Sequence, residues 1–233
     1  MSFRESKGNM FGFVTHTANF VSGKCPHDCL FCYLKRFPQK EIHLDKKMFN
    51  TDLGKGNYIF IGSGNDMFAN EVPNSWITDI LDYCNNFDNK YLFLTKNPKR
   101  YNSCIKRFPK NTILGISLES DVNYPITNAP APRERWKQFK NLNFPHKMVC
   151  IEPILDFHIK YLLNYIDGIE NLDFVVIGAD SKGHHLREPT SRKISCFLEE
   201  LKQISLTTVL TQKGIEDKER FKIIIKPNLA RLL

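Results

Sequence analysis

Short β-branched and aromatic runs alternate with segments of helical period along most of this 233-residue chain. Strands are predicted at 11–17, 58–63, 91–96, 112–119, 147–153, 173–179 and 207–212. Helices are predicted at 74–87, 98–108, 132–142, 157–167 and 190–204. This alternation is typical of βαβ units in a parallel sheet. About six or seven units are too few for the eight of a closed barrel, so we predict an α/β fold, a partial open barrel, in one domain, residues 1–233.

The composition favours a cytoplasmic protein with no membrane partner. Residues 1–10 have no apolar signal region, and no apolar stretch approaches the ~20 residues that span a bilayer. Seven cysteines, of which three are clustered, are not laid out as a secreted disulfide framework. Lysine and arginine exceed aspartate and glutamate by 33 to 25, a net charge of +8. This excess favours a polyanion such as nucleic acid, although a solvated basic surface explains it equally well.

Polar segments follow most of the predicted strands. After the second to seventh strands these segments are GSGNDMF, TKNP, SLES, EP, GADSKG and QKG. Parallel α/β proteins bind ligands at the carboxyl ends of their strands. We therefore expect the functional site on this face.

Three cysteines, Cys25, Cys29 and Cys32, follow the first predicted strand with the spacing C-x3-C-x2-C. Thiolates select zinc or iron–sulfur clusters, and three of them suit a 4Fe-4S cluster whose fourth iron stays open to an outside ligand. The alternative is a closed zinc site completed by His27 or His16. The spacing favours the cluster.

The stretch KCPHDCLFCYLKR resembles the cysteine motif of the radical S-adenosylmethionine (radical SAM) superfamily, with Phe31 in its aromatic position. The resemblance implies a partial (β/α)6 TIM-like barrel, here with an additional C-terminal strand or helix. It also implies a 4Fe-4S cluster on the three cysteines and SAM on the open iron. Reductive cleavage of SAM would give methionine and a 5'-deoxyadenosyl radical that modifies or repairs a substrate. An external one-electron donor of the flavodoxin or ferredoxin type is implied as a partner.

Further segments carry the resemblance along nearly the whole chain. They include LFLTKNP, CIEPIL, VVIGADSKG and VLTQKG, and they are similar to small phage and prokaryotic radical-SAM-like proteins without an established substrate. The stretch CYLKR also resembles spore photoproduct lyase, a DNA-repair member of the superfamily. The resemblance therefore names cofactors and leaves the substrate open.

The SAM contacts follow from the same resemblance. The segment that binds the SAM amino group corresponds to Gly62, Ser63, Gly64, Asn65 and Asp66, which depart from the common Gly-Gly-Glu form. Ser117 and Glu119 correspond to the residues that reach the SAM ribose and carboxylate, and strand alternation puts them on one face. Gly178 corresponds to the segment that approaches adenine.

Other residues are candidates for contact with the substrate. If Glu152 points into the barrel, Cys150 does as well, either as a hydrogen donor or as a small buried hydrophobe. The long loop 120–135 is a candidate substrate cover. Candidate substrate-binding cations are Lys96, Arg133, Arg135, Lys182 and Lys213.

Two other kinds of protein remain open from the sequence. One is a zinc- or cluster-stabilised nucleic-acid-binding module without SAM chemistry. The other is a cluster protein that acts as a redox sensor or scaffold and has no affinity for SAM.

Overall fold

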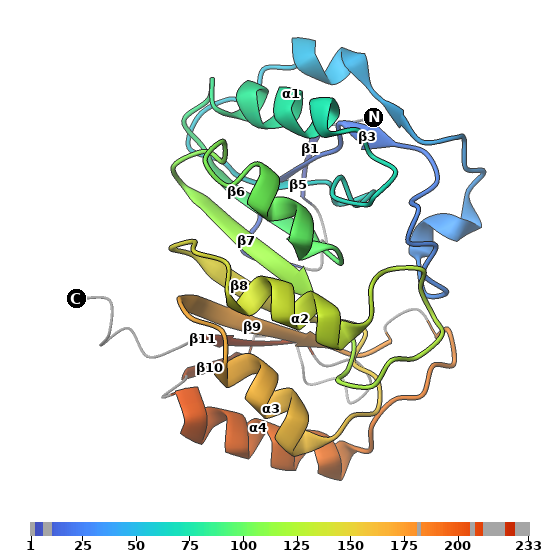
Figure 1. The fold of residues 1–233 in the computed structure, drawn as a ribbon, viewed down its shortest axis with the longest axis vertical. Helices are drawn as coiled ribbons and strands as arrows, with labels where there is room; N and C mark the ends of the chain where they lie inside the picture. The colour runs from blue at the N-terminus through green and yellow to red at the C-terminus, as the bar shows by residue number, and fades with distance from the viewer. Residues whose placement is uncertain (1–2, 7–10, 181–182, 206–207, 212–221, 227–233) are drawn as a thin grey trace. The chain divides into compact units, whose positions relative to one another are not determined.

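The computed structural model describes residues 3–6, 11–180, 183–205, 208–211 and 222–226 (Figure 1). The chain divides into two compact units, Met1–Gly115 with Thr127–Ala129 and Ile116–Ile126 with Pro130–Leu233. The single domain expected from the sequence stays a prediction. Among the described helices, none combines the length and apolar character that a bilayer span requires.

The first unit is built on parallel strands. Strands β2 (His16–Ala18), β5 (Tyr58–Ile61) and β6 (Lys90–Thr95) lie parallel in this order, with β1 (Phe3–Glu5) antiparallel to β2. Strand β7 (Thr112–Ser117) follows β6 in the sheet order and passes into the second unit after Gly115. The unit also contains a small antiparallel ribbon, one helix and three 3-10 turns: β3 (Val21–Ser22), β4 (His43–Leu44), α1 (Asn74–Cys84), η1 (Tyr33–Arg36), η2 (Lys46–Asn50) and η3 (Pro98–Ser103).

The second unit combines parallel and antiparallel strands with three helices. Strand β8 (Lys147–Ile151) is parallel to β9 (Leu172–Gly178), and β11 (Lys222–Lys226) pairs antiparallel with both β9 and β10 (Thr208–Thr211). The helices are α2 (Pro132–Lys140), α3 (Ile159–Asp167) and α4 (Ser191–Ser205). Helices α3 and α4 lie side by side (Figure 1).

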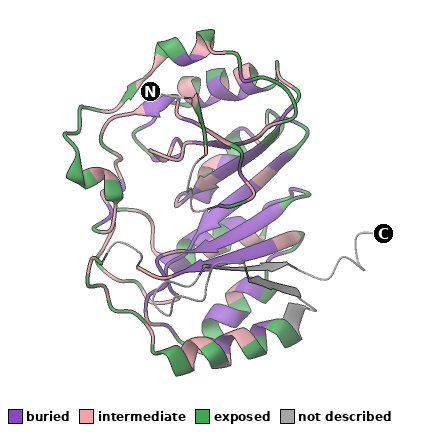
Figure 2. Ribbon diagram, turned by 180° about the vertical axis from the view of Figure 1, so that it is seen from behind, coloured by how far each residue is buried: buried purple, intermediate pink, exposed green. Residues whose placement is uncertain are grey.

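Hydrophobic periodicity explains these elements. In α1, the buried residues Ile77, Ile80, Leu81 and Cys84 recur at the helical spacing of three and four, so one face packs inward. All five residues of β8 are buried, as expected for a parallel strand covered on both faces. In Figure 2 the parallel strands are coloured mostly as buried, and the helices carry both buried and exposed residues. The strands are thus buried in the core, and polar loops follow their carboxyl ends.

The α/β fold with parallel central strands is confirmed, and the barrel form stays a prediction. Two local predictions differ from the structure. The strand expected at 11–17 is shorter in the structure, where β2 covers only His16–Ala18. The segment 98–108 begins as the 3-10 turn η3, in which buried Tyr101 donates from its hydroxyl to the carbonyls of Phe93 and Gly115. This tertiary anchor fixes a short turn where the sequence pattern predicts a longer helix.

Candidate functional site

The three cysteines lie in a loop that the β3–β4 ribbon closes. The backbone N–H of Lys24 donates to the carbonyl of Lys40 at 2.8 Å, so residues 24–40 form a loop with joined ends. Gly23 precedes it with φ of +96°, and a Cβ at this position would lie 2.2 Å from the Glu41 carbonyl oxygen. Only glycine fits both the positive φ and this close backbone approach. We call residues 24–40 the cysteine loop.

Two tight turns order the cysteines within this loop. The N–H of Asp28 donates to the Cys25 carbonyl and the N–H of Cys32 to the Cys29 carbonyl, both at 3.1 Å. All three thiols are free of disulfides; Cys29 is buried, and its Sγ donates to the Thr127 hydroxyl at 3.2 Å. Burial, followed by the negative charge of Asp66, raises the pKa of the Cys25 thiol to about 12. The free thiol is therefore protonated at neutral pH and must release its proton to bind a metal.

The donor set fits an iron–sulfur cluster by its chemistry. Three thiols that form no disulfide occur within eight residues, and thiolates are the ligands that such clusters use. Within the described part of the chain, no three His, Cys, Asp or Glu side chains are arranged together as a metal site. Of the fourth zinc ligands considered from the sequence, His27 bonds Asp66 through Nε2, and the His16 ring stacks on Phe3 with centroids 5.0 Å apart. Each of these contacts leaves a second ring nitrogen, so the closed zinc site stays an alternative.

A buried histidine–carboxylate hydrogen bond ties the cysteine loop to the segment after β5. His27 Nε2 lies 2.8 Å from Asp66 Oδ2, and these side chains are 6% and 10% exposed. Asp66 also accepts hydrogen bonds from the Thr95 hydroxyl and from the backbone N–H groups of Lys96 and Phe68. Asp66 therefore joins the loops that follow β3, β5 and β6.

The environment keeps the Asp66 carboxyl ionised. Burial raises its pKa, but the hydrogen bond and charge of His27, together with the two backbone N–H donors, outweigh burial and lower the pKa below the ordinary value. Sequence reasoning placed Asp66 among the SAM contacts, but its carboxylate is committed to neighbouring protein groups. The sequence shows a histidine between two of the cysteines and an aspartate after a later strand. Nothing in the sequence alone indicates that these two residues pair.

The rest of the segment 62–66 forms a small polar turn. Gly62 has φ of +83°, and the backbone N–H of Gly64 donates to Asn19 Oδ1 at 2.7 Å. The Ser63 hydroxyl contacts the same Asn19 side chain. Asn65 is 4% exposed and donates from Nδ2 to the Gly23 carbonyl at 3.0 Å, whereas its Oδ1 is buried with no donor among the described residues. The segment thus contains a buried acceptor that no described protein group satisfies.

Two further predicted site residues meet in the first unit. Lys96 Nζ lies 5.2 Å from the centre of the Phe31 ring, within the range of a cation–π contact. Lys96 is thus partly engaged by the aromatic residue of the cysteine motif. Its prediction as a substrate cation is not tested by this contact.

In the second unit, Glu119 and Arg135 form a buried pair. Arg135 NH1 donates to Glu119 Oε2 at 2.8 Å and to the Ser117 carbonyl at 2.9 Å, and the side chains are 1% and 3% exposed for Arg135 and Glu119. Arg135 Nε donates to the Pro130 carbonyl, and the Ser117 hydroxyl lies 3.3 Å from Glu119 Oε1. Arg135 is therefore not the exposed substrate cation suggested by the sequence: its guanidinium is buried and holds Glu119.

Glu152 and Gly178 are also neighbours. A Cβ on Gly178 would lie 2.6 Å from Glu152 Cδ, so the missing side chain gives room for the carboxyl group. Cys150 is fully buried on β8. Arg133 is exposed on α2, whereas Lys182 and Lys213 lie outside the described residues. The loop expected as a substrate cover is anchored, because the hydroxyls of Ser120 and Tyr124 both donate to the Asp156 carbonyl.

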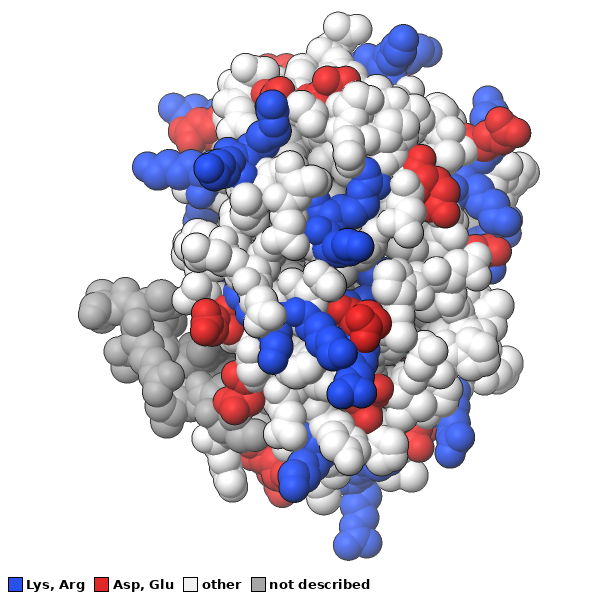
Figure 3. Space-filling view, in the orientation of Figure 1, with Lys and Arg blue, Asp and Glu red and all other residues white. Residues whose placement is uncertain are grey.

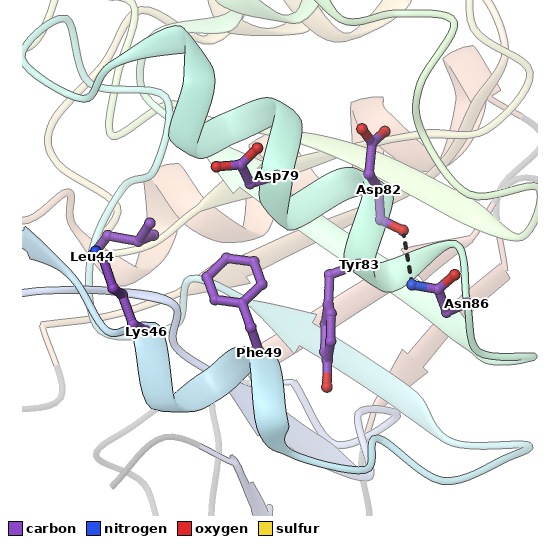
Figure 4. A pocket seen from close by; sticks show the side chains of 7 residues that line it. All are labelled: Leu44, Lys46, Phe49, Asp79, Asp82, Tyr83 and Asn86. Atoms are coloured by element: carbon purple, nitrogen blue, oxygen red, sulfur yellow. Dashed lines mark hydrogen bonds between the residues drawn. The ribbon is translucent and has the colours of Figure 1, made fainter.

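A separate hollow of about 600 Å³ lies beside α1 in the first unit (Figure 4). None of the predicted site residues lines it. The residues that do are Leu44, Lys46, Phe49, Asp79, Asp82, Tyr83 and Asn86. Asn86 lies just beyond the end of α1 and donates from Nδ2 to the Asp82 carbonyl, so this bond caps the helix end.

Solved structures with a similar fold include those of spore photoproduct lyase. One, a mutant with bound AdoMet and dinucleoside spore photoproduct, has a TM-score of 0.55 and 10% identity over 98% of this chain and 72% of that chain. Another, complexed with dinucleoside spore photoproduct, has a TM-score of 0.55 and 11% identity over 99% and 72%. The chain is thus an α/β protein with a fold like that of spore photoproduct lyase.

The family is given by a match to residues 13–218. The matching family model is described as "Protein of unknown function (DUF5131)", and the chain belongs to this family. No curated protein matches the chain.

Proposed function

We propose that this protein is an iron–sulfur enzyme of the radical SAM kind, which binds a 4Fe-4S cluster and SAM and acts on an unidentified substrate. The observation that carries the proposal is the cysteine loop: three thiols outside any disulfide, on a loop closed at Gly23 and tied to segment 62–66 by His27 and Asp66. The fold similarity to a lyase with bound AdoMet supports it.

The cysteines would hold the cluster, and neighbouring residues would hold SAM. Bound to Cys25, Cys29 and Cys32 and reduced by an external donor of the flavodoxin or ferredoxin type, the cluster would supply the electron for reductive cleavage of SAM. Asn65 Oδ1 is a buried acceptor suited to the SAM amino group. Ser117 and Glu119 are the proposed contacts to SAM ribose and carboxylate, and Gly178 to adenine.

The protein's own groups would position the cluster and SAM and exclude water. Arg135 fixes the rotamer of the Glu119 carboxylate through its hydrogen bond and through its anchors on Ser117 and Pro130. The buried His27–Asp66 pair fixes the turn between Cys25 and Cys29. A role of Cys150 as a hydrogen donor, and of Glu152, Lys96 and Arg133 in substrate contact, belongs to the same proposal.

Anaerobic reconstitution with iron and sulfide tests the proposal. We expect a full 4Fe-4S content in the wild type and its loss when Cys25, Cys29 or Cys32 is changed to Ala. Cys196→Ala is the matched control, because this cysteine lies outside the loop on α4 and its removal leaves the three thiols intact. Stoichiometric zinc without acid-labile sulfide would support the nucleic-acid-binding module instead. A full cluster in Cys29→Ala would contradict the ligand assignment.

A further inference from the structure

Exposed apolar side chains are concentrated in the cysteine loop. In the described part of the chain, the large hydrophobic residues that stand exposed are Leu30, Tyr33, Phe37 and Tyr161, at 57%, 45%, 55% and 58%. Three of these four lie within eight residues of one loop. Single exposed hydrophobic residues are ordinary, but such a group indicates a binding surface.

Cations stand between these apolar residues. Residues 35–40, KRFPQK, form one uninterrupted exposed run. Lys35 is paired with Asp28 at 2.8 Å, but no carboxylate among the described residues pairs with Arg36 or Lys40. We call Leu30, Tyr33, Arg36, Phe37 and Lys40 the loop face.

The loop face is held in an ordered conformation. Gln39 Nε2 donates to the carbonyls of Leu34 and Phe37, and Lys40 closes the loop onto Lys24. In the 3-10 turn η1, side chains three residues apart lie nearly above one another, so Tyr33 and Arg36 share a side. Most of this turn is exposed (Figure 2). The rings and charges are therefore presented on a fixed backbone.

We infer that the loop face binds single-stranded nucleic acid, with bases stacked on Tyr33 and Phe37 and phosphates bound by Arg36 and Lys40. Aromatic rings interleaved with unpaired cations are the surface that a strand with exposed bases recognises, and every base has a face that can stack. A duplex hides its base faces and offers the rings no partner. Charge supports an anionic strand, since residues 24–40 carry four Lys or Arg and one Asp.

The position next to Cys32 connects this surface with the proposed chemistry. Tyr33 directly follows the last cysteine of the motif, so a strand on the loop face lies beside the proposed cofactor site. The claim that this strand is the substrate rests on the proposed function. The claim that the loop face binds the strand does not. In Figure 3, Lys and Arg side chains occur in several groups with Asp and Glu among them, so net charge alone does not select the loop face.

Fluorescence anisotropy with a labelled single-stranded oligothymidine tests stacking. The reconstituted full chain is used without SAM or reductant, so that no chemistry occurs. Tyr33→Ala and Phe37→Ala should each weaken binding roughly fivefold to a hundredfold, the range for removal of one base–aromatic stack. Tyr161→Ala removes an equally exposed ring from α3 and should bind as the wild type does. Wild-type affinity in both loop variants, or equal weakening in the control, overturns the inference.

The salt dependence of binding tests the proposed phosphate contacts. Changing Arg36 and Lys40 together to Gln should reduce the slope of log Kd against log salt by about 1.4, at about 0.7 for each single-strand phosphate that the variant no longer neutralises. Changing exposed Lys106 and Lys110 to Gln is the matched control and should leave the slope unchanged. Equal slopes in all three proteins, or equally tight binding of the duplex, overturn the inference.

Iron content separates the two proposals. Iron and sulfide are measured in every preparation used for binding. If a chain that fails to take up a cluster still binds the strand through Tyr33 and Phe37, the proposed function fails and the loop face stands. If the cluster loads fully but the loop variants bind like the wild type, the loop face fails and the proposed function stands.

Discussion

Replacing Arg135 with Met should remove a large part of the free energy of unfolding. Arg135 is 1% exposed and donates to Glu119 Oε2, the Ser117 carbonyl and the Pro130 carbonyl. Removing one partner of a buried ion pair costs about 3–5 kcal/mol, because the other charge stays buried without it. We therefore expect Arg135→Met to lower the free energy of urea unfolding by about this much.

Two variants make the test specific. Arg107→Met removes an arginine whose pair with Asp82 is about half exposed on both sides, and such pairs contribute only about 0–1 kcal/mol. The double variant Arg135→Met/Glu119→Gln removes both charges of the buried pair. Its loss of unfolding free energy should therefore be smaller than the sum of the losses in Arg135→Met and Glu119→Gln. If Arg135→Met unfolds with the stability of Arg107→Met, or if the two single effects simply add, the pair does not hold this part of the second unit.

Three further predictions concern SAM, pH and the cysteine loop. Glu119→Ala should keep the cluster but weaken SAM binding by about 1–3 kcal/mol, as measured by calorimetry, because hydrogen bonds to a charged carboxylate are removed; unchanged affinity removes Glu119 from the site. Asp156 has its pKa lowered mainly by the Lys193 hydrogen bond, so its contribution to stability is fully present above its unfolded pKa and is lost as the pH falls through its folded pKa. The difference in unfolding free energy between wild type and Asp156→Asn should thus be constant from about pH 7 to 5 and shrink below about pH 4; a difference that grows on acidification contradicts this sign. Gly23→Ala should destabilise by more than about 1 kcal/mol and reduce iron uptake, whereas Gly56→Ala, with positive φ but no atom within 4 Å, should cost less and leave uptake unchanged; equal destabilisation in the two variants refutes the role of the Glu41 contact.

Local patterns in the sequence were sufficient for the α/β class and for most elements. The runs at 58–63 and 147–153 contain β5 and β8, and 74–87 contains α1, because buried strands and amphipathic helices leave strong periodic signals. The turn η3 was missed, because its form depends on the Tyr101 contacts with distant carbonyls. The sequence period contains no information about such tertiary anchors.

The candidate site could be predicted only in part. The cysteine spacing marks the loop, but pairings over long sequence separations have no signal in a single chain. Arg135 illustrates this limit: its place near the long loop suggested a free cation, while the fold buries it against Glu119, sixteen positions away. The His27–Asp66 pair, thirty-nine positions apart, is a second example.

Reductive cleavage of SAM measures the central claim most directly. The reconstituted protein is incubated with SAM and dithionite under anaerobic conditions, and methionine and 5'-deoxyadenosine are quantified against the Cys29→Ala variant. The proposal predicts formation of both products by the wild type and none above background by the variant. A wild type that carries a full 4Fe-4S cluster and yet produces neither, or a variant that produces both at the wild-type rate, would contradict the assignment to SAM chemistry.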